Sequence, residues 1–383
     1  MRIETMAVHA GCGIDKASGA VAESITPSMT FERDSEGQYP RGYFYSSKGN
    51  PNRNALEAAF AALEGGESAV AFASGCAAIA AVFRTLKPGD HVLVPDDVFH
   101  GTIRMLREIL PKWQISYSQA DMSDVNSVRA ALEKNTRLVW LETLSNPLLK
   151  VTDIDAVAQV ARDHGAISAV DNTFVTPIFQ RPLEQGADLV VHASTKYIGG
   201  HGDVLGGAVI AQKANAIVDG IVREIRQIQL LEGSVPSPFD CWLIHRGFKT
   251  LPGRMRAHSS NALQVAVALE KHPLISAVHY PGLASHPQFA LAARQLHGGF
   301  GGIVSIRVGG GAEIARAVCA NVKIFTHATS FGSAESLIQQ QAFSPTHGPG
   351  TLVPDDLLRL SVGLENPEDL IDDICGALTA ANA

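Results

Sequence analysis

The sequence predicts an α/β protein with a large domain built on a mostly parallel sheet and a smaller C-terminal α+β domain. Short, wholly apolar strands alternate with helical segments between residues 50 and 211. A long amphipathic stretch at residues 254–271 is then followed by further short strands. The chain has 383 residues, which is too long for one ordinary domain and suits a large domain plus a smaller one.

The first half of the chain defines the larger sheet. We expect helices at residues 54–63, 76–86, 102–110 and 154–164, and strands at 69–73, 91–95, 137–142, 166–171, 188–192 and 207–211. Gly65 and Gly66 mark the end of the first helix. Strands this apolar are buried on both faces, and ligands of such sheets bind beyond the carboxyl ends of the strands. Residues with chemical roles are therefore expected at those ends.

The second half predicts the smaller domain. A helix is expected at residues 254–271, after Pro252 and Gly253, with strands at 302–308 and 358–362 and a final helix at 368–378. The first forty-odd residues are rich in turns and predict an arm. We therefore divide the chain into an arm (1–48), a cofactor-binding α/β domain (49–245) and a C-terminal small domain (246–383).

Composition narrows the class of protein. Hydrophobic residues make up 46% and charged residues 18%, the balance of a globular protein with a large core. The net charge is -7, without a basic block that would indicate nucleic-acid binding. No apolar run is long enough for a bilayer, and the start of the chain does not resemble a signal peptide. The five cysteines lack metal-ligand spacing. We expect a cytoplasmic protein that binds no metal, membrane or nucleic acid.

Lys196 is the strongest candidate for chemistry. It follows an apolar strand, within the segment HASTKY at residues 192–197, and glycines follow it. Burial disfavours the charged form of a lysine, and the neutral amine can form a Schiff base. Nearby hydroxyl and N–H groups suit a phosphate. Taken alone, a solvated lysine at a strand end explains the same pattern.

Three further segments point to a bound cofactor and to a substrate that carries a carboxylate group. Asp171 ends an apolar strand, where its carboxylate needs a cationic partner such as a protonated pyridine nitrogen. The segment ASGCAA at residues 73–78 joins a strand to a helix start, which can bind a phosphate. Arg359 lies inside an apolar strand, and its planar guanidinium suits a carboxylate. Local capping or an internal salt bridge explains each segment singly.

Together, these segments resemble the cystathionine synthase and lyase family, the Cys/Met-metabolism enzymes that use pyridoxal phosphate. The resemblance covers nearly the whole chain. It runs through residues 7–11 (AVHAG), 49–51 (GNP), 140–143 (WLET), 145–147 (SNP), 170–174 (VDNTF), 194–201 (STKYIGGH), 246–251 (RGFKTL), 280–283 (YPGL), 335–337 (ESL) and 359–365 (RLSVGLE).

The resemblance implies the pyridoxal-phosphate-dependent transferase fold type I, which is the aspartate aminotransferase type. It also implies a homotetramer of paired dimers with active sites at the dimer interface. Lys196 would hold pyridoxal 5'-phosphate as a Schiff base and move protons between substrate carbons. Asp171 would pair with the ring nitrogen. The other implied cofactor contacts are Thr173 and Phe99 at the ring, and Gly75, Cys76, Ser194, Thr195 and the neighbouring subunit's Tyr45 at the phosphate.

The resemblance also implies which residues bind the substrate. The resemblance implies that Arg359 and Asn146 bind the α-carboxylate of an amino acid, and that Ser330 lies close to Lys196. Cystathionine-specific relatives often have acidic residues at the positions of Phe44 and Thr329. Neither residue is acidic here, so a smaller or differently charged γ-group fits better than cystathionine.

The sequence departs from the family pattern at other positions as well. Ser47 stands where the family has a phosphate-binding arginine, with Lys48 one residue out of step, and Ala193 replaces a usual serine. Phe99 replaces the ring-stacking tyrosine; it can stack but cannot transfer a proton. Either His100 supplies that proton function, or the leaving group departs without acid help.

The predicted reaction is γ-elimination from a γ-substituted L-amino acid, giving a 2-oxo acid and ammonia. Methionine-like, homoserine-ester-like, canavanine-like and cystathionine-like substrates all stay open. The first alternative is γ-replacement on an O-acylhomoserine, and the next is β-elimination from a cysteine conjugate. A non-catalytic protein that binds pyridoxal phosphate is a remote alternative.

Overall fold

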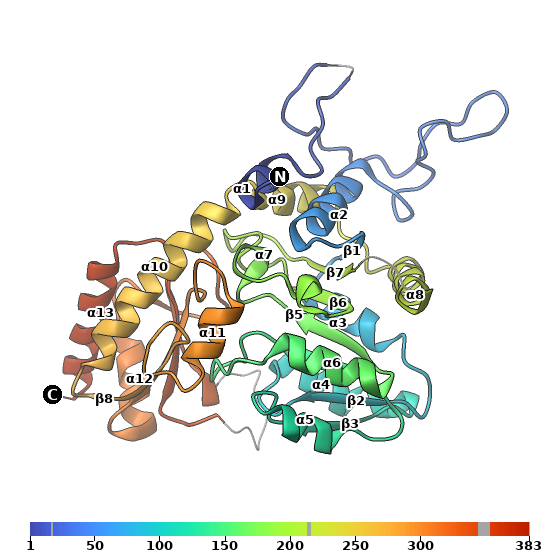
Figure 1. Ribbon diagram of the computed structural model, residues 1–383. Helices are drawn as coiled ribbons and strands as arrows, with labels where there is room; N and C mark the ends of the chain where they lie inside the picture. Colours follow the sequence, from blue (N-terminus) through green and yellow to red (C-terminus); the bar gives the residue numbers. More distant parts are fainter. Residues whose placement is uncertain (17, 213–215, 344–352, 383) are drawn as a thin grey trace.

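The fold is described from a computed structural model, which covers residues 1–16, 18–212, 216–343 and 353–382. Two sheets, each covered by helices, lie side by side, and an N-terminal segment extends away from them (Figure 1). The larger sheet belongs to the first part of the chain and the smaller sheet to the second part. The predicted α/β architecture with a large and a small sheet is confirmed.

The larger sheet has seven strands in the order β1-β7-β6-β5-β4-β2-β3. Only β7 runs antiparallel to its neighbours, so the sheet is mostly parallel, as predicted. The strands are β1 (Ser68–Phe72), β2 (His91–Pro95), β3 (Ser116–Ala120), β4 (Thr136–Glu142), β5 (Ile167–Asp171), β6 (Leu189–His192) and β7 (Gly207–Ala211).

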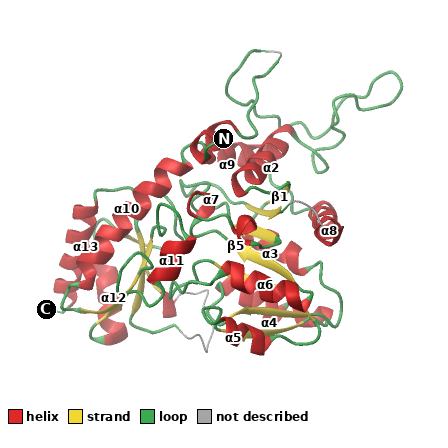
Figure 2. Ribbon diagram, viewed as in Figure 1, coloured by secondary structure: helices red, strands yellow, loops and turns green. Residues whose placement is uncertain are grey.

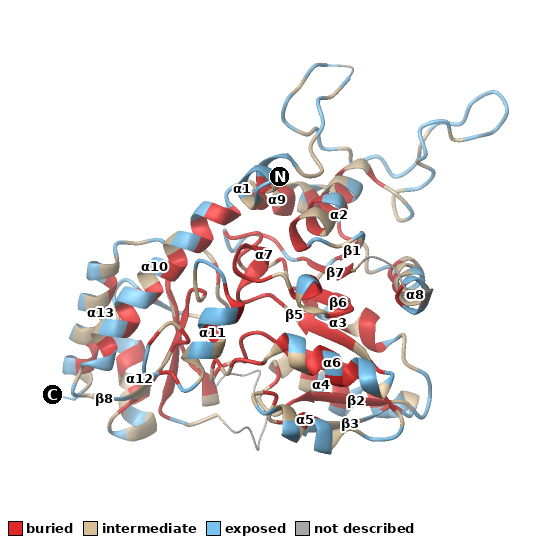
Figure 3. Cartoon of the chain, viewed as in Figure 1, coloured by how far each residue is buried: buried red, intermediate tan, exposed pale blue. Residues whose placement is uncertain are grey.

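Helices cover both faces of this sheet (Figure 2). One face packs against α3 (Gly75–Phe83), α4 (His100–Glu108) and α8 (Ala216–Glu232). The other face packs against α2 (Pro51–Glu64), α7 (Thr176–Phe179), α9 (Pro238–Phe248), α5 (Val125–Ala131) and α6 (Ile154–His164). Two short 3₁₀ helices complete this part, η1 (Leu110–Trp113) and η2 (Pro182–Gln185). The central strands are accordingly buried along their length (Figure 3).

Local sequence explains where α2 begins and ends. The Asn50 side chain accepts a hydrogen bond from the Asn52 N–H group, and Pro51 occupies the first turn. Gly65 ends the helix with a φ of 72°, a left-handed conformation that favours glycine. The end matches the prediction, whereas the helix begins three residues before the predicted Asn54 because Asn50 and Pro51 form the cap.

The smaller sheet has five strands in the order β10-β11-β12-β9-β8. The strands are β8 (Ile275–His279), β9 (Ile303–Val308), β10 (Thr326–His327), β11 (Leu337–Gln340) and β12 (Leu357–Ser361). The accompanying helices are α10 (Leu251–Glu270), α11 (Phe289–Gln295), α12 (Gly311–Asn321), α13 (Pro367–Ala381) and the 3₁₀ helix η3 (Gln341–Phe343). Side chains of α10, α12 and α13 form one core with this sheet.

The strand that sequence analysis missed in the larger sheet is β3. Its residues SYSQA are mostly polar, and only Ala120 is buried, because β3 lies at the sheet edge. An edge strand with one covered face lacks the continuous apolar run that marks central strands. The two-residue strand β10 was missed because so short a segment has no periodic pattern.

The N-terminal segment begins with α1 (Ile3–His9), which packs against α2 and α10. Among the described residues between α1 and α2, the only strand pairing is an isolated bridge between Thr30 and Tyr45. This segment extends away from the body as a long loop (Figure 1). In the part of the chain described, no helix is both long and apolar enough to cross a membrane. The predicted division at residues 48 and 245 stays a prediction.

Candidate active site

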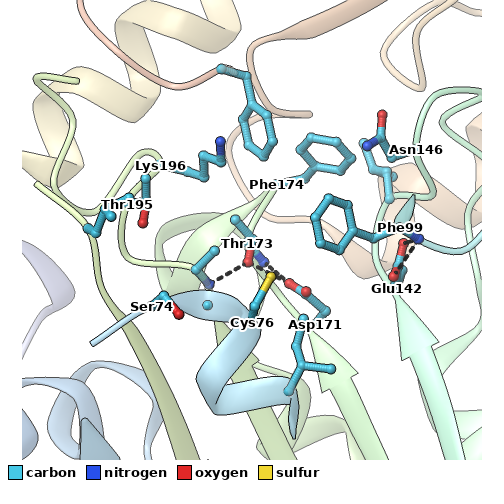
Figure 4. Close-up of a pocket in the computed structure, with 16 residues that line it drawn as sticks. Ser74, Cys76, Phe99, Glu142, Asn146, Asp171, Thr173, Phe174, Thr195 and Lys196 are labelled. Carbon is cyan, nitrogen blue, oxygen red and sulfur yellow. Dashed lines mark hydrogen bonds between the residues drawn. The ribbon is translucent and has the colours of Figure 1, made fainter. Parts of the chain in front are cut away.

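The carboxyl ends of β4, β5 and β6 open into a cavity of about 220 Å³ (Figure 4). A second cavity, of about 450 Å³, adjoins it on the side of the smaller sheet and shares Lys196 with it. We call these the inner and the outer cavity. The inner cavity is lined by the predicted residues Gly75, Cys76, Phe99, Asn146, Asp171, Thr173, Thr195 and Lys196. The outer cavity adds Ser330 and Arg359.

Lys196 lies where the two cavities meet. Its Nζ donates a hydrogen bond to Ser330 Oγ at 2.6 Å and lies 4.7 Å from the centre of the Phe331 ring. Burial, together with the nearby Arg359 charge, lowers the pKa of Lys196 to about 8. Roughly a tenth of this amine is therefore neutral at pH 7, far more than for an ordinary lysine, and the neutral amine is the reactive form of a lysine nucleophile.

The backbone around Lys196 is fixed by Arg254 from α10. The Arg254 guanidinium donates to the carbonyl oxygens of Tyr197 (2.6 Å), Ile198 (3.3 Å) and Gly247 (2.8 Å). A side chain on Gly200 would collide with this guanidinium, since a Cβ there would lie 2.1 Å from it. The buried arginine thus ties the lysine loop to α9 and α10 without any carboxylate in the contacts described.

We expect Arg254→Met to lower the free energy of unfolding by roughly 2–4 kcal/mol, because it leaves several buried carbonyl oxygens without a donor. Chemical denaturation of the cofactor-free protein measures this loss. The matched control is Arg256→Met on the same helix, whose exposed ion pair with Glu4 contributes less than about 1 kcal/mol. Equal losses in the two variants would contradict the role given to Arg254.

Asp171 and Thr173 form the floor of the inner cavity. Asp171 Oδ1 accepts from the Thr173 N–H (3.0 Å) and hydroxyl (2.5 Å), and the Ala193 N–H donates to Thr173 Oγ1 at 2.9 Å. Burial raises the pKa of Asp171. Among the described residues, Asp171 makes no ion pair. A cationic ligand atom at this point would lower that pKa and hold the carboxylate ionised.

Glu142 is a second buried carboxyl group, beside Asp171 on the neighbouring strand. Both of its oxygens accept from the Phe99 N–H at 2.9 Å, so it fixes the start of α4 and the Phe99 ring that lines the cavity (Figure 4). Burial, with the neighbouring Asp171 charge, raises the pKa of Glu142 well above its ordinary value.

The start of α3 faces the other end of the inner cavity. Ser74 caps the helix by accepting from the Ala77 N–H at 3.1 Å, and the first N–H groups of the helix have no acceptor within it. A Cβ on Gly75 would lie 2.6 Å from Ala193 Cβ, so only glycine allows this close approach. Thr195, which lines the cavity, exchanges hydrogen bonds with Gly206 through its Oγ1. Ser194 is not among the lining residues; its hydroxyl lies close to Gly206 and has no hydrogen-bond partner among the residues described. An anion at this helix start would find several unused donors.

Arg359 enters the outer cavity from β12. It is 5% exposed, and it donates to Asn146 Oδ1 (3.2 Å) and to the Ser330 carbonyl oxygen (2.9 Å). Burial lowers the pKa of Arg359 to about 10, so the guanidinium stays charged at neutral pH. The sequence-predicted group of Arg359, Asn146 and Ser330 is thus brought together.

The arm residues lie outside both cavities of this chain. Tyr45 is 39% exposed and Phe44 is 42% exposed. Lys48 Nζ lies 5.3 Å from the centre of the Phe44 ring rather than near the inner cavity. Thr329, the other position that is acidic in some relatives, does line the outer cavity.

Sequence reasoning gave no role to two residues of the site. Glu142 carried a detectable signal, because it ends an apolar strand just as Asp171 does. Phe331 lines both cavities and packs against Lys196, yet it lies in a loop without periodic pattern. His100, considered as a replacement proton donor, lines the outer cavity.

These groups fit one type of ligand. A carbonyl group can react with the Lys196 amine, a protonated ring nitrogen would meet Asp171, and a phosphate would meet the start of α3 beside Thr195. Pyridoxal 5'-phosphate has all three features, and Phe99 offers a flat ring beside the same cavity.

Comparison with known proteins agrees with this fit. The sequence pattern of the family described as "Cys/Met metabolism PLP-dependent enzyme" matches residues 4–379. The chain is 46% identical over 380 residues to a cystathionine gamma-synthase of Mycobacterium leprae, covering 98% of this chain and 96% of the relative. It is 43% identical over 383 residues to a cystathionine beta-lyase of Lactococcus lactis subsp. cremoris, covering 98% of both.

A solved structure gives the same result in three dimensions. Cystathionine gamma-lyase from Lactobacillus plantarum, complexed with L-serine, superposes with a TM-score of 0.94 at 38% identity, covering 100% of each chain. The three relatives carry three different reaction names. The chain belongs to the family of pyridoxal-phosphate-dependent enzymes of cysteine and methionine metabolism.

Proposed function

We propose that the protein catalyses γ-elimination from a γ-substituted L-amino acid, releasing a 2-oxo acid and ammonia. The position of Lys196 at the junction of the two cavities supports this proposal most directly. One amine there can reach the cofactor on one side and successive carbons of a substrate bound towards Arg359 on the other. The outer cavity leaves room for a γ-substituent beyond those carbons.

We assign the following roles within this proposal. Lys196 carries the cofactor and moves protons at the α- and β-carbons of the substrate. Asp171 stabilises the protonated ring nitrogen, with Thr173 holding Asp171 in place. Gly75, Cys76, Ser194 and Thr195 bind the phosphate. Arg359 and Asn146 bind the α-carboxylate, and Ser330 orients the Lys196 amine.

Pyridoxal phosphate, when bound, supplies an electron sink that stabilises negative charge on the substrate carbons. The chain's own residues determine which bonds are aligned for cleavage. Arg359 fixes the carboxylate end of the substrate in the outer cavity. Phe99 lines the inner cavity, where its side chain would pack beside the cofactor ring. The substrate α-carbon is then held within reach of the Lys196 amine, which accepts the α-proton and later returns it at another carbon.

The lowered pKa of Lys196 predicts how cofactor loading depends on pH. The amine is neutral above its pKa, so the loading rate of cofactor-free protein should rise with pH and reach half its maximum near pH 8. An ordinary lysine would give a midpoint near 10.4. Stopped-flow visible absorbance, recorded from pH 6 to 10, measures the profile. A midpoint above 10 would show that the amine is solvated.

The proposed reaction is tested on the cofactor-loaded protein with single amino acids. The set is methionine, cystathionine, O-acetylhomoserine, canavanine, homocysteine and cysteine, each followed by visible absorbance and by 2-oxo acid release. Release of a four-carbon 2-oxo acid from one γ-substituted substrate supports γ-elimination and names the substrate. Release of pyruvate from cysteine or cystathionine instead would indicate β-elimination.

The missing hydroxyl at Phe99 predicts a gain of function. If thioether substrates react slowly because the leaving thiolate lacks an acid, Phe99→Tyr should speed them by at least about tenfold, within the range for general acid catalysis. Ester substrates, whose leaving group departs without such help, should change less than about threefold. Steady-state kcat/KM for both classes measures this contrast. An unchanged thioether rate would show that the hydroxyl was not limiting.

The second candidate function is γ-replacement, in which a thiol nucleophile takes the place of the γ-substituent. The 46% identity to a relative named cystathionine gamma-synthase favours it. The two reactions use the same residues and differ in their products. Adding cysteine to the O-acylhomoserine assay distinguishes them, since replacement forms cystathionine and suppresses 2-oxo acid release.

We also propose a homotetramer of paired dimers in which Tyr45 binds the cofactor phosphate of the neighbouring subunit. The exposed aromatic side chains of Tyr45 and Phe44, on an arm that leaves the body of its own chain, support this arrangement (Figure 1). Light scattering measures the subunit number. Mixing a Tyr45→Ala protein with a Lys196→Ala protein should restore activity if the residues act across the interface.

A further inference from the structure

Residues 145–150, which we call the Asn146 turn, carry a group of the proposed substrate site, so this inference rests on the proposed function. The turn is closed by hydrogen bonds from the Ser145 N–H to the Lys150 carbonyl oxygen (3.1 Å) and from the Lys150 N–H to Ser145 Oγ (2.9 Å). It follows β4 of the larger sheet, yet Asn146 Oδ1 accepts from Arg359 of the smaller sheet at 3.2 Å. The two carboxylate-binding groups therefore come from different sheets.

The chain that leaves the Asn146 turn is buried but irregular. Residues 149–153 form no helix or strand before α6 begins at Ile154. The side chains of Val151, Thr152 and Ile154 are all buried. Buried backbone N–H and carbonyl groups need hydrogen-bond partners, and an irregular segment does not obtain them from a strand ladder.

Two glutamines of the smaller domain supply these partners. Gln288, just before α11, accepts from the Val151 N–H at 2.8 Å and donates to the Val151 carbonyl oxygen. Gln295, at the end of α11, accepts from the Ile154 N–H at 3.0 Å and donates to the Thr152 carbonyl oxygen at 2.9 Å. Each carboxamide uses its oxygen and its nitrogen together, as the backbone of a neighbouring strand would.

The spacing of the two glutamines fits the segment that they bind. They are seven positions apart (295 minus 288), so they lie on one face of α11, two turns from each other. Two helical turns rise about 10 Å, which is also the length of about three residues of extended chain. Figure 1 shows α11 on the side of its domain that faces the larger sheet, and Ala292 and Leu296 pack into the core beneath that sheet.

Ser305 on β9 makes a third contact with the Asn146 turn. Its Oγ donates to the Pro147 carbonyl oxygen at 2.7 Å, and the residue is fully buried. Ser305 lies directly opposite Arg359 in the antiparallel pair of β9 and β12. The residue beside Asn146 is therefore bonded to the residue beside Arg359, which relates the positions of the two carboxylate-binding groups.

We propose that Gln288, Gln295 and Ser305 are positioning residues for the substrate carboxylate. They hold the Asn146 turn against the domain that carries Arg359. Asn146 and Arg359 then meet an arriving carboxylate as one preformed unit, and their relative position need not be fixed during binding. Loss of one of these contacts lets the turn shift, and a shift of about 1 Å is enough to weaken the action of groups that bind together.

The test compares the dissociation constants of L-alanine and L-alaninamide, measured by titrating the visible absorbance of the cofactor-loaded protein. The two probes share the amine, and only L-alanine has a carboxylate. Gln295→Met keeps the size of the side chain but removes both hydrogen bonds. It should lower the preference for L-alanine by about tenfold and change the affinity for L-alaninamide by less than about threefold. The matched control is Gln264→Met, at an exposed position of α10, which should leave the preference within about twofold.

A second measurement separates positioning from a general loss of stability. In an Asn146→Ala background, Gln295→Met should change the preference by less than about twofold, because the group that Gln295 positions is already absent. A further tenfold loss in that background would show that Gln295 acts by another route, and it would overturn the inference.

The outcomes separate this inference from the proposed function. If neither probe shifts the absorbance of the wild-type protein, the proposed function fails. If the wild type prefers L-alanine and Gln295→Met keeps that preference, the inference is overturned while the function stands. Equal affinity of the wild type for the two probes would overturn the assignment of Asn146 and Arg359 to the carboxylate, and the inference with it. Should Gln295→Met not fold, Gln288→Met tests the same prediction at the Val151 contact.

Discussion

Lys196→Ala is expected to lower turnover by roughly 10⁴-fold or more, because the variant loses both the covalent attachment of the cofactor and the proton carrier of the proposed mechanism. The cofactor should still enter through the phosphate and ring contacts. It would then be held without a covalent bond and should be removed by dialysis. Product formation and the absorbance of the protein before and after dialysis measure both effects.

The control for this variant is Lys249→Ala. Lys249 ends α9 and lines neither cavity, so its removal should leave turnover within about twofold and the cofactor attached. Turnover by Lys196→Ala at a tenth of the wild-type rate would contradict the central role given to this lysine. An added small amine should restore part of the lost activity if proton transfer is the missing function.

Asp171→Asn should lower kcat by roughly 10³-fold with the cofactor still bound. The amide keeps an oxygen for the Thr173 contacts but cannot carry the negative charge that holds the ring nitrogen protonated. The electron sink should therefore weaken while the geometry persists. Single-turnover kinetics, together with the content of bound cofactor, distinguish this loss from loss of the cofactor itself.

Glu142→Gln is the matched control for Asp171→Asn. Glu142 is the neighbouring carboxyl group on β4, and burial raises its pKa as it does that of Asp171. Exchanging the carboxyl for an amide should leave kcat within about fivefold, since one oxygen can still accept from the Phe99 N–H. Equal losses in the two variants would show that Asp171 has no special electrostatic role.

Sequence patterns predicted the central fold well, because most strands of the larger sheet are short, apolar and bounded by helices. The strand at His91–Pro95 and the helix at Ile154–His164 have the expected limits. The edge strand β3 was missed since its exposed residues are polar. Buried strands display their environment in their composition, whereas edge strands depend on pairing partners that are distant in sequence.

The residues of the candidate site likewise fall into those that the sequence pattern indicated and those that it did not. Lys196, Asp171 and Arg359 could be predicted as candidates because a charged residue at the end of, or within, an apolar strand conflicts with its surroundings unless it has a partner or a role. Phe331 gave no such signal. Its place beside Lys196 comes from a contact between two loops that meet only in the folded chain.

Both sheets contribute residues to the outer cavity. The inner cavity is lined mainly from β4, β5, β6 and the start of α3, while Arg359 and Ser330, which line the outer cavity, come from the smaller sheet and its loops. Residues distant in sequence thus meet at Lys196, with Asp171 on the larger sheet and Arg359 on the smaller one. Under the proposed function, the relative position of the two sheets sets the distance between the cofactor and the bound carboxylate.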